Sequence, residues 1–175
     1  MEDRYSAMEW FDSLHQAITS ARARRRGKET GFEEALNGTA RLLSVVRQRE
    51  ASVWWVGNGG SAAICSHLSQ DMLNKLDMKS LYCGDASMMT CMANDFGYEN
   101  VYAHPLAKLV KKGDLLIAIS SSGNSDNILA CIELADEKGM DIITLSGFST
   151  DNRLWNAGAS FSFFVASDLY GIVEM

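Results

Sequence analysis

The spacing of apolar residues changes near residue 51. Before it, apolar side chains recur every three or four positions in two stretches, which is typical of amphipathic helices. Gly27 and the polar residues up to Gly31 separate the stretches, so we expect residues 1–50 to form an antiparallel helix pair. The basic run at residues 22–28 is expected to end the first helix, where cations complement the helix dipole.

After residue 51, short apolar runs alternate with helical stretches. Strands are expected at residues 52–56, 80–83, 114–119, 141–145 and 160–165, and helices at 61–76, 85–94, 101–110, 125–138 and 152–155. Strands that alternate with helices form βαβ units around a parallel sheet. The predicted fold class is α/β, a three-layer αβα sandwich related to Rossmann and flavodoxin folds and preceded by the helix pair. The helix pair and residues 51–175 are expected to form one domain.

Composition narrows the classes of protein. Apolar residues make up 47% and charged residues 22% of the 175 residues, as in ordinary globular domains. The net charge of −6 argues against a surface that tracks nucleic acid, and the basic run at residues 22–28 is better explained as a solvated helix end than as a nucleic-acid patch. No stretch approaches the ~20 apolar residues that span a bilayer, so we expect no membrane association. The four cysteines lack CxxC spacing, so we expect buried free thiols in a cytoplasmic protein.

A glycine-rich turn follows the first strand of the alternating region. Gly57, Asn58, Gly59, Gly60 and Ser61 allow a ligand to approach backbone N–H groups at a helix start. With Ala62 the turn also matches the dinucleotide pattern GxGxxA. That pattern requires an acidic residue ~20 positions on, whereas Asp85 lies 28 positions after Gly57, so a dinucleotide site is disfavoured.

A serine-rich turn follows the most apolar strand. Residues 120–125, with the sequence SSSGNS, place four hydroxyls and free N–H groups at the start of a helix, which suits a phosphate. The turn lacks the lysine of a P-loop, so a phosphate monoester fits better than a nucleoside triphosphate. Helix capping alone would account for one serine and not for four. Because both turns follow parallel strands, we expect them to share one crevice.

Several motifs together resemble those of the sugar isomerase (SIS) domain, in particular its phosphoheptose isomerase branch. They are the turn GNGGS at 57–61, NDFG at 94–97, SSSGNS at 120–125, EKGM at 137–140 and ITLSG at 143–147. The resemblance spans nearly the whole chain. It implies isomerisation of sedoheptulose 7-phosphate to a heptose 7-phosphate for lipopolysaccharide or capsule biosynthesis. It also implies a homotetramer assembled in part by the N-terminal helices.

The resemblance also implies roles for individual residues. Substrate-binding positions would be Asn58, Gly59, Gly60, Ser61, Asn94, Asp95, Ser120, Ser121, Ser122, Asn124 and Ser125. Some members bind zinc through a His and a Glu one turn apart and a Gln and a His on a C-terminal helix. The corresponding catalytic and zinc-binding positions here are His67, Asp71 and Glu174, while the second His has no counterpart because the chain stops at Met175. We accordingly expect the C-terminal helix to be cut off in its first turn.

Two functions remain open at this stage. A ketose–aldose isomerase needs a base, an acid and a group that stabilises an enediolate, and a carboxylate beside an imidazole or metal can supply them. The resemblance assigns the base to Asp71, which is one methylene shorter than Glu, and the acid to the missing His. The alternative is a non-catalytic SIS module that binds a sugar phosphate or a protein partner such as a replication initiator. The serine turn, His67 and Asp95 favour the enzyme, whereas the substitution at Asp71 and the missing His favour the alternative.

Overall fold

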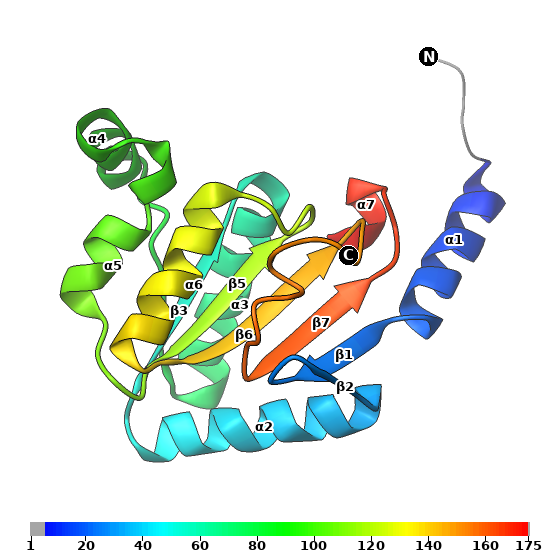
Figure 1. Cartoon of the computed structure of the whole chain (residues 1–175), viewed down its shortest axis with the longest axis horizontal. Coiled ribbons are helices and arrows are strands. Elements are labelled where there is room, and N and C mark those ends of the chain that lie inside the picture. Colours follow the sequence, from blue (N-terminus) through cyan, green and yellow to red (C-terminus); the bar gives the residue numbers. More distant parts are fainter. Residues whose placement is uncertain (1–5, 175) are drawn as a thin grey trace.

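The computed structural model describes residues 6–174, which form a sheet between two layers of helices (Figure 1). The elements in chain order are α1 (Ala7–Thr19), β1 (Arg22–Arg25), β2 (Lys28–Thr30), α2 (Phe32–Gln48), β3 (Ser52–Gly57), α3 (Gly59–Leu76), β4 (Lys79–Tyr82), α4 (Ala86–Phe96), the 3-10 helix η1 (Tyr98–Asn100), α5 (Ala103–Leu109), β5 (Leu115–Ser120), α6 (Asp126–Lys138), β6 (Asp141–Gly147), β7 (Phe161–Val165) and α7 (Tyr170–Val173). The predicted three-layer αβα architecture is confirmed.

The sheet has the strand order β2-β1-β7-β6-β5-β3-β4. The five strands from β7 to β4 are parallel, whereas β1 runs antiparallel to both β2 and β7. After β4 the chain returns to the opposite side of β3 to form β5. In a parallel sheet, such a reversal opens a crevice at the carboxyl ends of the two strands.

Each face of the sheet carries its own apolar core. Along β3, Trp54 and Val56 pack on the face covered by α5 and α6, while Val53 and Trp55 pack on the face covered by α2 and α3. Successive side chains of a strand point to opposite faces, so a strand buried on both sides must be apolar throughout. This requirement explains the continuous apolar run that predicted β5.

The basic run near residue 25 does not end a helix. It forms the β1–β2 hairpin, in which Ala23 lies opposite Thr30 and Arg25 opposite Lys28. The two turn residues, Arg26 and Gly27, both have positive φ angles, 49° and 76°, as a tight two-residue hairpin loop requires. The helical interpretation missed this loop because the three successive arginines at 24–26 obscured the turn pattern of Arg26-Gly27.

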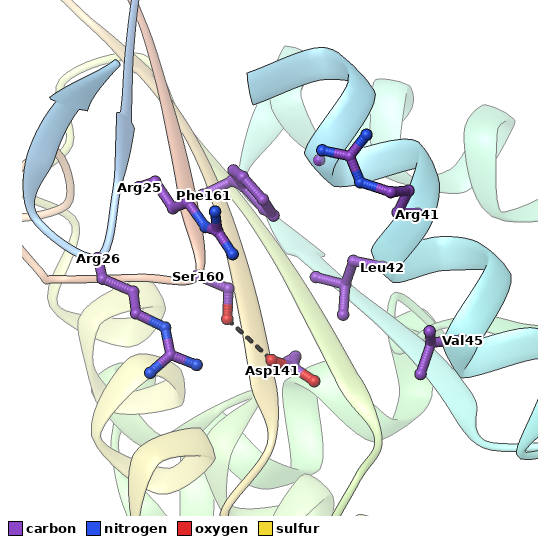
Figure 2. A pocket seen from close by; sticks show the side chains of 9 residues that line it. Arg25, Arg26, Arg41, Leu42, Val45, Asp141, Ser160 and Phe161 are labelled. Carbon is purple, nitrogen blue, oxygen red and sulfur yellow. Dashed lines mark hydrogen bonds between the residues drawn. The ribbon is translucent and has the colours of Figure 1, made fainter. Parts of the chain in front are cut away.

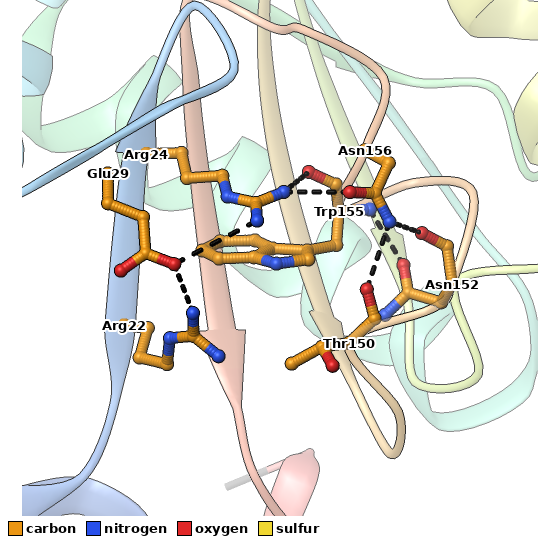
Figure 3. A network of polar contacts seen from close by, with 7 residues as sticks. All are labelled: Arg22, Arg24, Glu29, Thr150, Asn152, Trp155 and Asn156. Atoms are coloured by element: carbon orange, nitrogen blue, oxygen red, sulfur yellow. Dashed lines mark hydrogen bonds and ion pairs between the residues drawn. The ribbon is translucent and has the colours of Figure 1, made fainter.

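The hairpin is fastened to the loop before β7 by a stacked arginine (Figure 3). The guanidinium of Arg24 lies 4.3 Å from the ring centre of Trp155, which is fully buried, and its Nη1 donates to Asn156 Oδ1 over 2.8 Å. Arg22 pairs with Glu29 across the two strands. Stacking and hydrogen bonding therefore fix the hairpin on the edge of the sheet.

Three other expectations were wrong. Residues 152–155 form turns and no helix. Cys91 is exposed, whereas Cys65, Cys83 and Cys131 are buried free thiols as expected. The helices α1 and α2 exist but do not form a packed pair, because α1 lies against α7 and stands away from α2 (Figure 1). None of the helices among residues 6–174 is both long and apolar enough to cross a bilayer.

Candidate functional site

The glycine-rich and serine-rich turns are neighbours at the carboxyl ends of β3 and β5. Gly57, the last residue of β3, lies opposite Ile119 in β5, so the residues that follow each strand emerge side by side. Both turns lead directly into helices, α3 and α6. This is the crevice that the reversal of strand order creates, and the expected convergence of the two turns is confirmed.

The serine turn runs from the end of β5 to the N-terminus of α6. Ser120 and Ser121 are buried, and the Ser120 hydroxyl donates to Ser125 Oγ over 3.3 Å. The first N–H groups of a helix have no partner within the helix, and the helix dipole adds partial positive charge there. The turn can therefore offer hydroxyl and amide donors to a bound anion.

The glycine-rich turn is joined to α6 by a pair of amide side chains. Asn58 and Asn127 donate to each other, each Nδ2 to the other's Oδ1 over 2.9 Å. Tyr98 donates its hydroxyl to Asn58 Oδ1 over 3.2 Å. The hydroxyl of the buried Tyr102 donates to the Gly57 carbonyl over 2.6 Å, and burial raises the pKa of this phenol. Asn58 is thus held from two sides.

A carboxylate reaches the two turns from the C-terminal segment. Glu174 Oε1 accepts hydrogen bonds from the hydroxyls of Ser61, at 3.2 Å, and Ser121, at 3.0 Å. Gly60 permits this approach, because a Cβ atom at that position would collide with the Glu174 carboxylate. The carboxylate therefore brings α7, α3 and the serine turn together.

These groups line a cavity of about 120 Å³. Its walls are formed by residues from the glycine-rich turn and α3, from the end of β5 and the serine turn, and from α7 and the residue after it, namely Asn58, Ser61, Ile119, Ser120, Ser121, Ser122, Ser125, Tyr170 and Glu174. Pockets for whole small molecules have volumes of ~300 Å³ or more, so this cavity suits one end of a ligand. Its polar lining matches a phosphate group.

The loop between β6 and β7 clamps the serine turn from outside. Leu154 N donates to the Gly123 carbonyl over 2.9 Å, and Arg153 N donates to Asn124 Oδ1 over 3.0 Å. Asn152 is buried, and its Nδ2 donates to the Ser149 carbonyl at 2.7 Å and the Gly147 carbonyl at 3.1 Å. Gly123 has a φ of 65° and lies so close to Asn152 that a Cβ atom would not fit. The conformation of the serine turn is therefore fixed by this loop.

The other predicted substrate-binding residues lie at varying distances from the cavity. Gly59 and Gly60 form the first turn of α3 beside it, while Asn124 is exposed, is not among the lining residues and accepts from Arg153 N. Asn94 and Asp95 are exposed near the end of α4 and are not among the lining residues. Asp95 accepts a hydrogen bond from the Cys91 thiol at 3.5 Å, and this contact raises the pKa of the thiol.

His67 and Asp71 lie apart from the cavity, on α3. The His67 side chain is 75% exposed, and its Nε2 lies 3.9 Å from Asp71 Oδ2. Lys75 Nζ lies 2.9 Å from Asp71 Oδ1, and this contact lowers the pKa of the carboxyl group. A lowered pKa makes a carboxylate a weaker proton acceptor. In this chain Asp71 is therefore one member of a surface ion pair with Lys75.

The predicted zinc ligands do not fit one metal ion within the described chain. Between residues 6 and 174, no three His, Cys, Asp or Glu side chains come close enough together to hold a metal. His67 and Asp71 face each other on α3, while Glu174 is bonded to the two serines of the cavity. We therefore derive no chemical step through zinc.

The sequence-based prediction did not include four residues of the site. Asn127 and Tyr98 contact Asn58, Tyr170 lines the cavity, and Asn152 supports the serine turn. Asn127 could have been found, because a polar residue in the first turn of a helix that follows a phosphate-binding turn faces the ligand end. The other three come from distant segments, and no local spacing marks them.

Comparisons with known proteins agree with this geometry. The model of the SIS domain matches residues 17–147 of the chain. The phosphoheptose isomerase of Maridesulfovibrio salexigens is 30% identical over 151 residues, which are 81% of this chain and 74% of that protein. The phosphoheptose isomerase of Proteus mirabilis is 38% identical over 119 residues, 65% of this chain and 62% of its own length. The chain thus spans between three fifths and three quarters of these relatives.

Solved structures show the same arrangement of elements. A phosphoheptose isomerase from Francisella tularensis superimposes with a TM-score of 0.79, over 94% of this chain and 86% of that chain, at 25% identity.

Proposed function

The chain belongs to the SIS domain family, and on this premise we propose that it is an aldose–ketose isomerase of sugar phosphates. The proposed substrate is sedoheptulose 7-phosphate and the product a heptose 7-phosphate, because the matched relatives are phosphoheptose isomerases. The observation that carries the proposal is the cavity in which serine hydroxyls and the Glu174 carboxylate meet. We propose that the product enters lipopolysaccharide or capsule biosynthesis in the cytoplasm.

The serine turn would hold the phosphate. Ser120, Ser121, Ser122 and Ser125 supply hydroxyls, and the start of α6 supplies N–H groups and a favourable dipole. Asn58 and Asn127 would face the hydroxyls of the sugar, since their amides are fixed in orientation by each other. The seven-carbon chain would curl past the glycine-rich turn, so that its carbonyl end returns to Glu174 at the same cavity.

Glu174 would act as the base in place of Asp71. Isomerisation moves a proton from the hydroxyl-bearing carbon next to the carbonyl to the former carbonyl carbon, through an enediol. Glu174 would take the proton from the first carbon and return it to the second, while protons also move between the two oxygens. Glu174 is the carboxylate that lines the cavity, whereas Asp71 is held by Lys75 outside it. The hydroxyls of Ser61 and Ser121 orient the Glu174 carboxylate.

The assay follows the aldose phosphate formed from sedoheptulose 7-phosphate by NMR, with the Ser122→Ala/Ser125→Ala variant beside the wild type. We expect turnover by the wild type and at least a tenfold higher KM for the variant, because two hydroxyl donors are lost. Ser44→Ala removes an exposed hydroxyl of α2, which contributes no residue to the cavity, and should change neither constant. Absence of turnover by the wild type would contradict the isomerase.

A non-catalytic SIS module is the second candidate. It is favoured by the exposed His67 and the ion-paired Asp71, which the resemblance had assigned to catalysis. Sugar-phosphate binding without turnover, lost in the Ser122→Ala/Ser125→Ala variant, would support a sensor of sugar phosphates. Binding of a protein partner such as a replication initiator without sugar-phosphate binding would support an adaptor.

We also propose a homotetramer and keep zinc as a separate prediction. The apolar side chains Met8, Phe11 and Ile18 of α1 are between 58% and 68% exposed, which suits burial against another copy of the chain. Light scattering should give four times the chain mass, and Phe11→Ser should lower the measured mass.

Metal analysis of the wild type and His67→Ala tests zinc directly, since unchanged zinc content in the variant would exclude His67 as a ligand.

A further inference from the structure

A second cavity, lined by charged and apolar side chains, lies at the amino ends of the strands, whereas the serine turn lies at their carboxyl ends. It has a volume of about 220 Å³ and is formed by the β1–β2 hairpin, α2 and the amino ends of β6 and β7 (Figure 2). Asp141 begins β6 here, while Gly147 ends the same strand beside Ser121. The two cavities are therefore separate sites at opposite ends of one strand.

Three arginines surround this second cavity. Arg25 and Arg26 reach from the hairpin and Arg41 from α2 on the other side, with Ser160 between them (Figure 2). None of the three forms an ion pair with any residue in the described range, whereas Arg22, Arg24 and Arg153 all do. In a chain with a net charge of −6, three unpaired guanidinium groups in one place are a local excess of positive charge.

The hairpin holds Arg26 in a costly conformation. Arg26 has a φ of 49°, a left-handed conformation that disfavours residues with a Cβ atom by roughly 1 kcal/mol. Its backbone N–H is fixed to the Ala159 carbonyl over 2.9 Å. Asparagine or glycine would fill such a turn position with less strain. The hairpin turn and this backbone contact therefore fix where the Arg26 side chain leaves the backbone at the cavity.

The floor of the cavity is also fixed. The Phe161 ring packs against Gly38 of α2, where a Cβ atom would strike the ring, and the Arg25 guanidinium lies 5.8 Å from the centre of the ring. Arg24, stacked on Trp155, locks the same hairpin to the loop before β7 (Figure 3). The positions of Arg25 and Arg26 are therefore supported on two sides by packed aromatic rings.

A carboxylate in the cavity narrows the class of ligand. Asp141 Oδ1 accepts from Ser160 Oγ over 2.9 Å, so its second oxygen is left to accept from a ligand. This carboxylate would weaken the binding of a bare anion to the arginines, whereas hydroxyl groups on a ligand would donate to it. Guanidinium groups match phosphate oxygens in pairs.

We propose that this cavity, here called the arginine cavity, binds a multiply phosphorylated metabolite that also carries hydroxyl groups. Arg25, Arg26 and Arg41 would contact the phosphates, and Asp141 with Ser160 the hydroxyls. The site is independent of the serine turn and of the isomerase activity proposed above.

The test uses pyrophosphate as the probe and calorimetry as the measurement. In a Ser122→Ala/Ser125→Ala background, which weakens the serine turn, we expect pyrophosphate still to bind. Adding Arg25→Ala and Arg41→Ala should weaken that binding at least tenfold. Asp141→Asn should strengthen it several-fold, because the repulsion disappears and the acceptor for Ser160 is kept.

Arg47→Ala with Arg49→Ala is the matched control, because it removes the same charge from the far end of α2. We expect this pair to leave the affinity within about twofold. Equal losses in both arginine pairs would show unspecific attraction and overturn the proposal. Unchanged affinity in the Arg25/Arg41 variant, or weaker binding by Asp141→Asn, would overturn it as well.

Discussion

At the scale of single residues, the Glu174 carboxylate determines both which ligand groups the cavity beside the serine turn can bind and whether a proton acceptor is available there. It accepts from Ser61 and Ser121, whose hydroxyls would otherwise be free for an anion. A negative charge at this position opposes a phosphate and at the same time offers a proton acceptor beside it. Binding and proton transfer therefore make opposite demands on this one side chain.

Replacing Glu174 by glutamine should separate the two demands. Glu174→Gln keeps an oxygen that accepts from the serines but removes the charge and the basicity. We expect kcat to fall by about a hundredfold or more, as for loss of a general base, while KM stays equal or falls. Steady-state kinetics with sedoheptulose 7-phosphate measure both constants.

Glu133→Gln, which changes an exposed carboxylate on α6, is the control for this variant and should behave as the wild type. An unchanged kcat in Glu174→Gln would place the base on another residue. A raised KM with unchanged kcat would make Glu174 a binding residue only.

At the scale of elements, segments remote in sequence hold the site in shape. Strand β5, α6 and the serine turn could be predicted because apolar runs and serine clusters are local signals. The loop at residues 148–156 could not be predicted, since its role depends on the contact between Asn152 and Gly123. The β1–β2 hairpin could not be predicted either, because its successive arginines do not form a recognisable strand pattern. Likewise, His67 and Asp71 have the spacing of a ligand pair, but this spacing does not reveal that Lys75 forms an ion pair with the Asp71 carboxylate.

Asn152→Ala tests how far the serine turn depends on this loop. The change removes the donor to the Ser149 and Gly147 carbonyls and the acceptor for the Trp155 backbone N–H, in a buried or partly buried environment. We expect the free energy of unfolding to fall by about 1–3 kcal/mol, as for buried hydrogen-bonding groups that lose their partners. KM for the sugar phosphate should rise more than kcat falls.

Urea unfolding and kinetics measure these effects, with Thr150→Ala as the control. The Thr150 side chain is exposed in the same loop, so its removal should cost less than about 0.5 kcal/mol. If Asn152→Ala unfolds like the control, the loop does not hold the turn through this side chain.

At the scale of the whole molecule, the two apolar cores set how stability depends on pH. Cys65, Cys83 and Cys131 are buried in these cores. Burial raises the pKa of Cys65 to about 12 and that of Cys83 to about 11, from an ordinary value of 9.0, and it also raises the pKa of Cys131. In the unfolded chain these thiols would ionise near pH 9, so the folded state keeps protons that the unfolded state releases.

The free energy of unfolding should therefore fall as the pH rises above about 9. Each thiol that is ionised only in the unfolded chain contributes a loss of about 1.4 kcal/mol per pH unit, until the pH reaches its folded pKa. The stabilisation is complete below pH 9, because the thiols are then protonated in both states. Urea unfolding under reducing conditions, compared at pH 8, 9 and 10, measures the slope of the free energy of unfolding against pH.

Cys65→Ala should reduce this slope by the contribution of one thiol, and Cys91→Ala, at an exposed position, should reduce it much less. Equal slopes for the wild type and Cys65→Ala would show that the core does not hold the Cys65 thiol protonated.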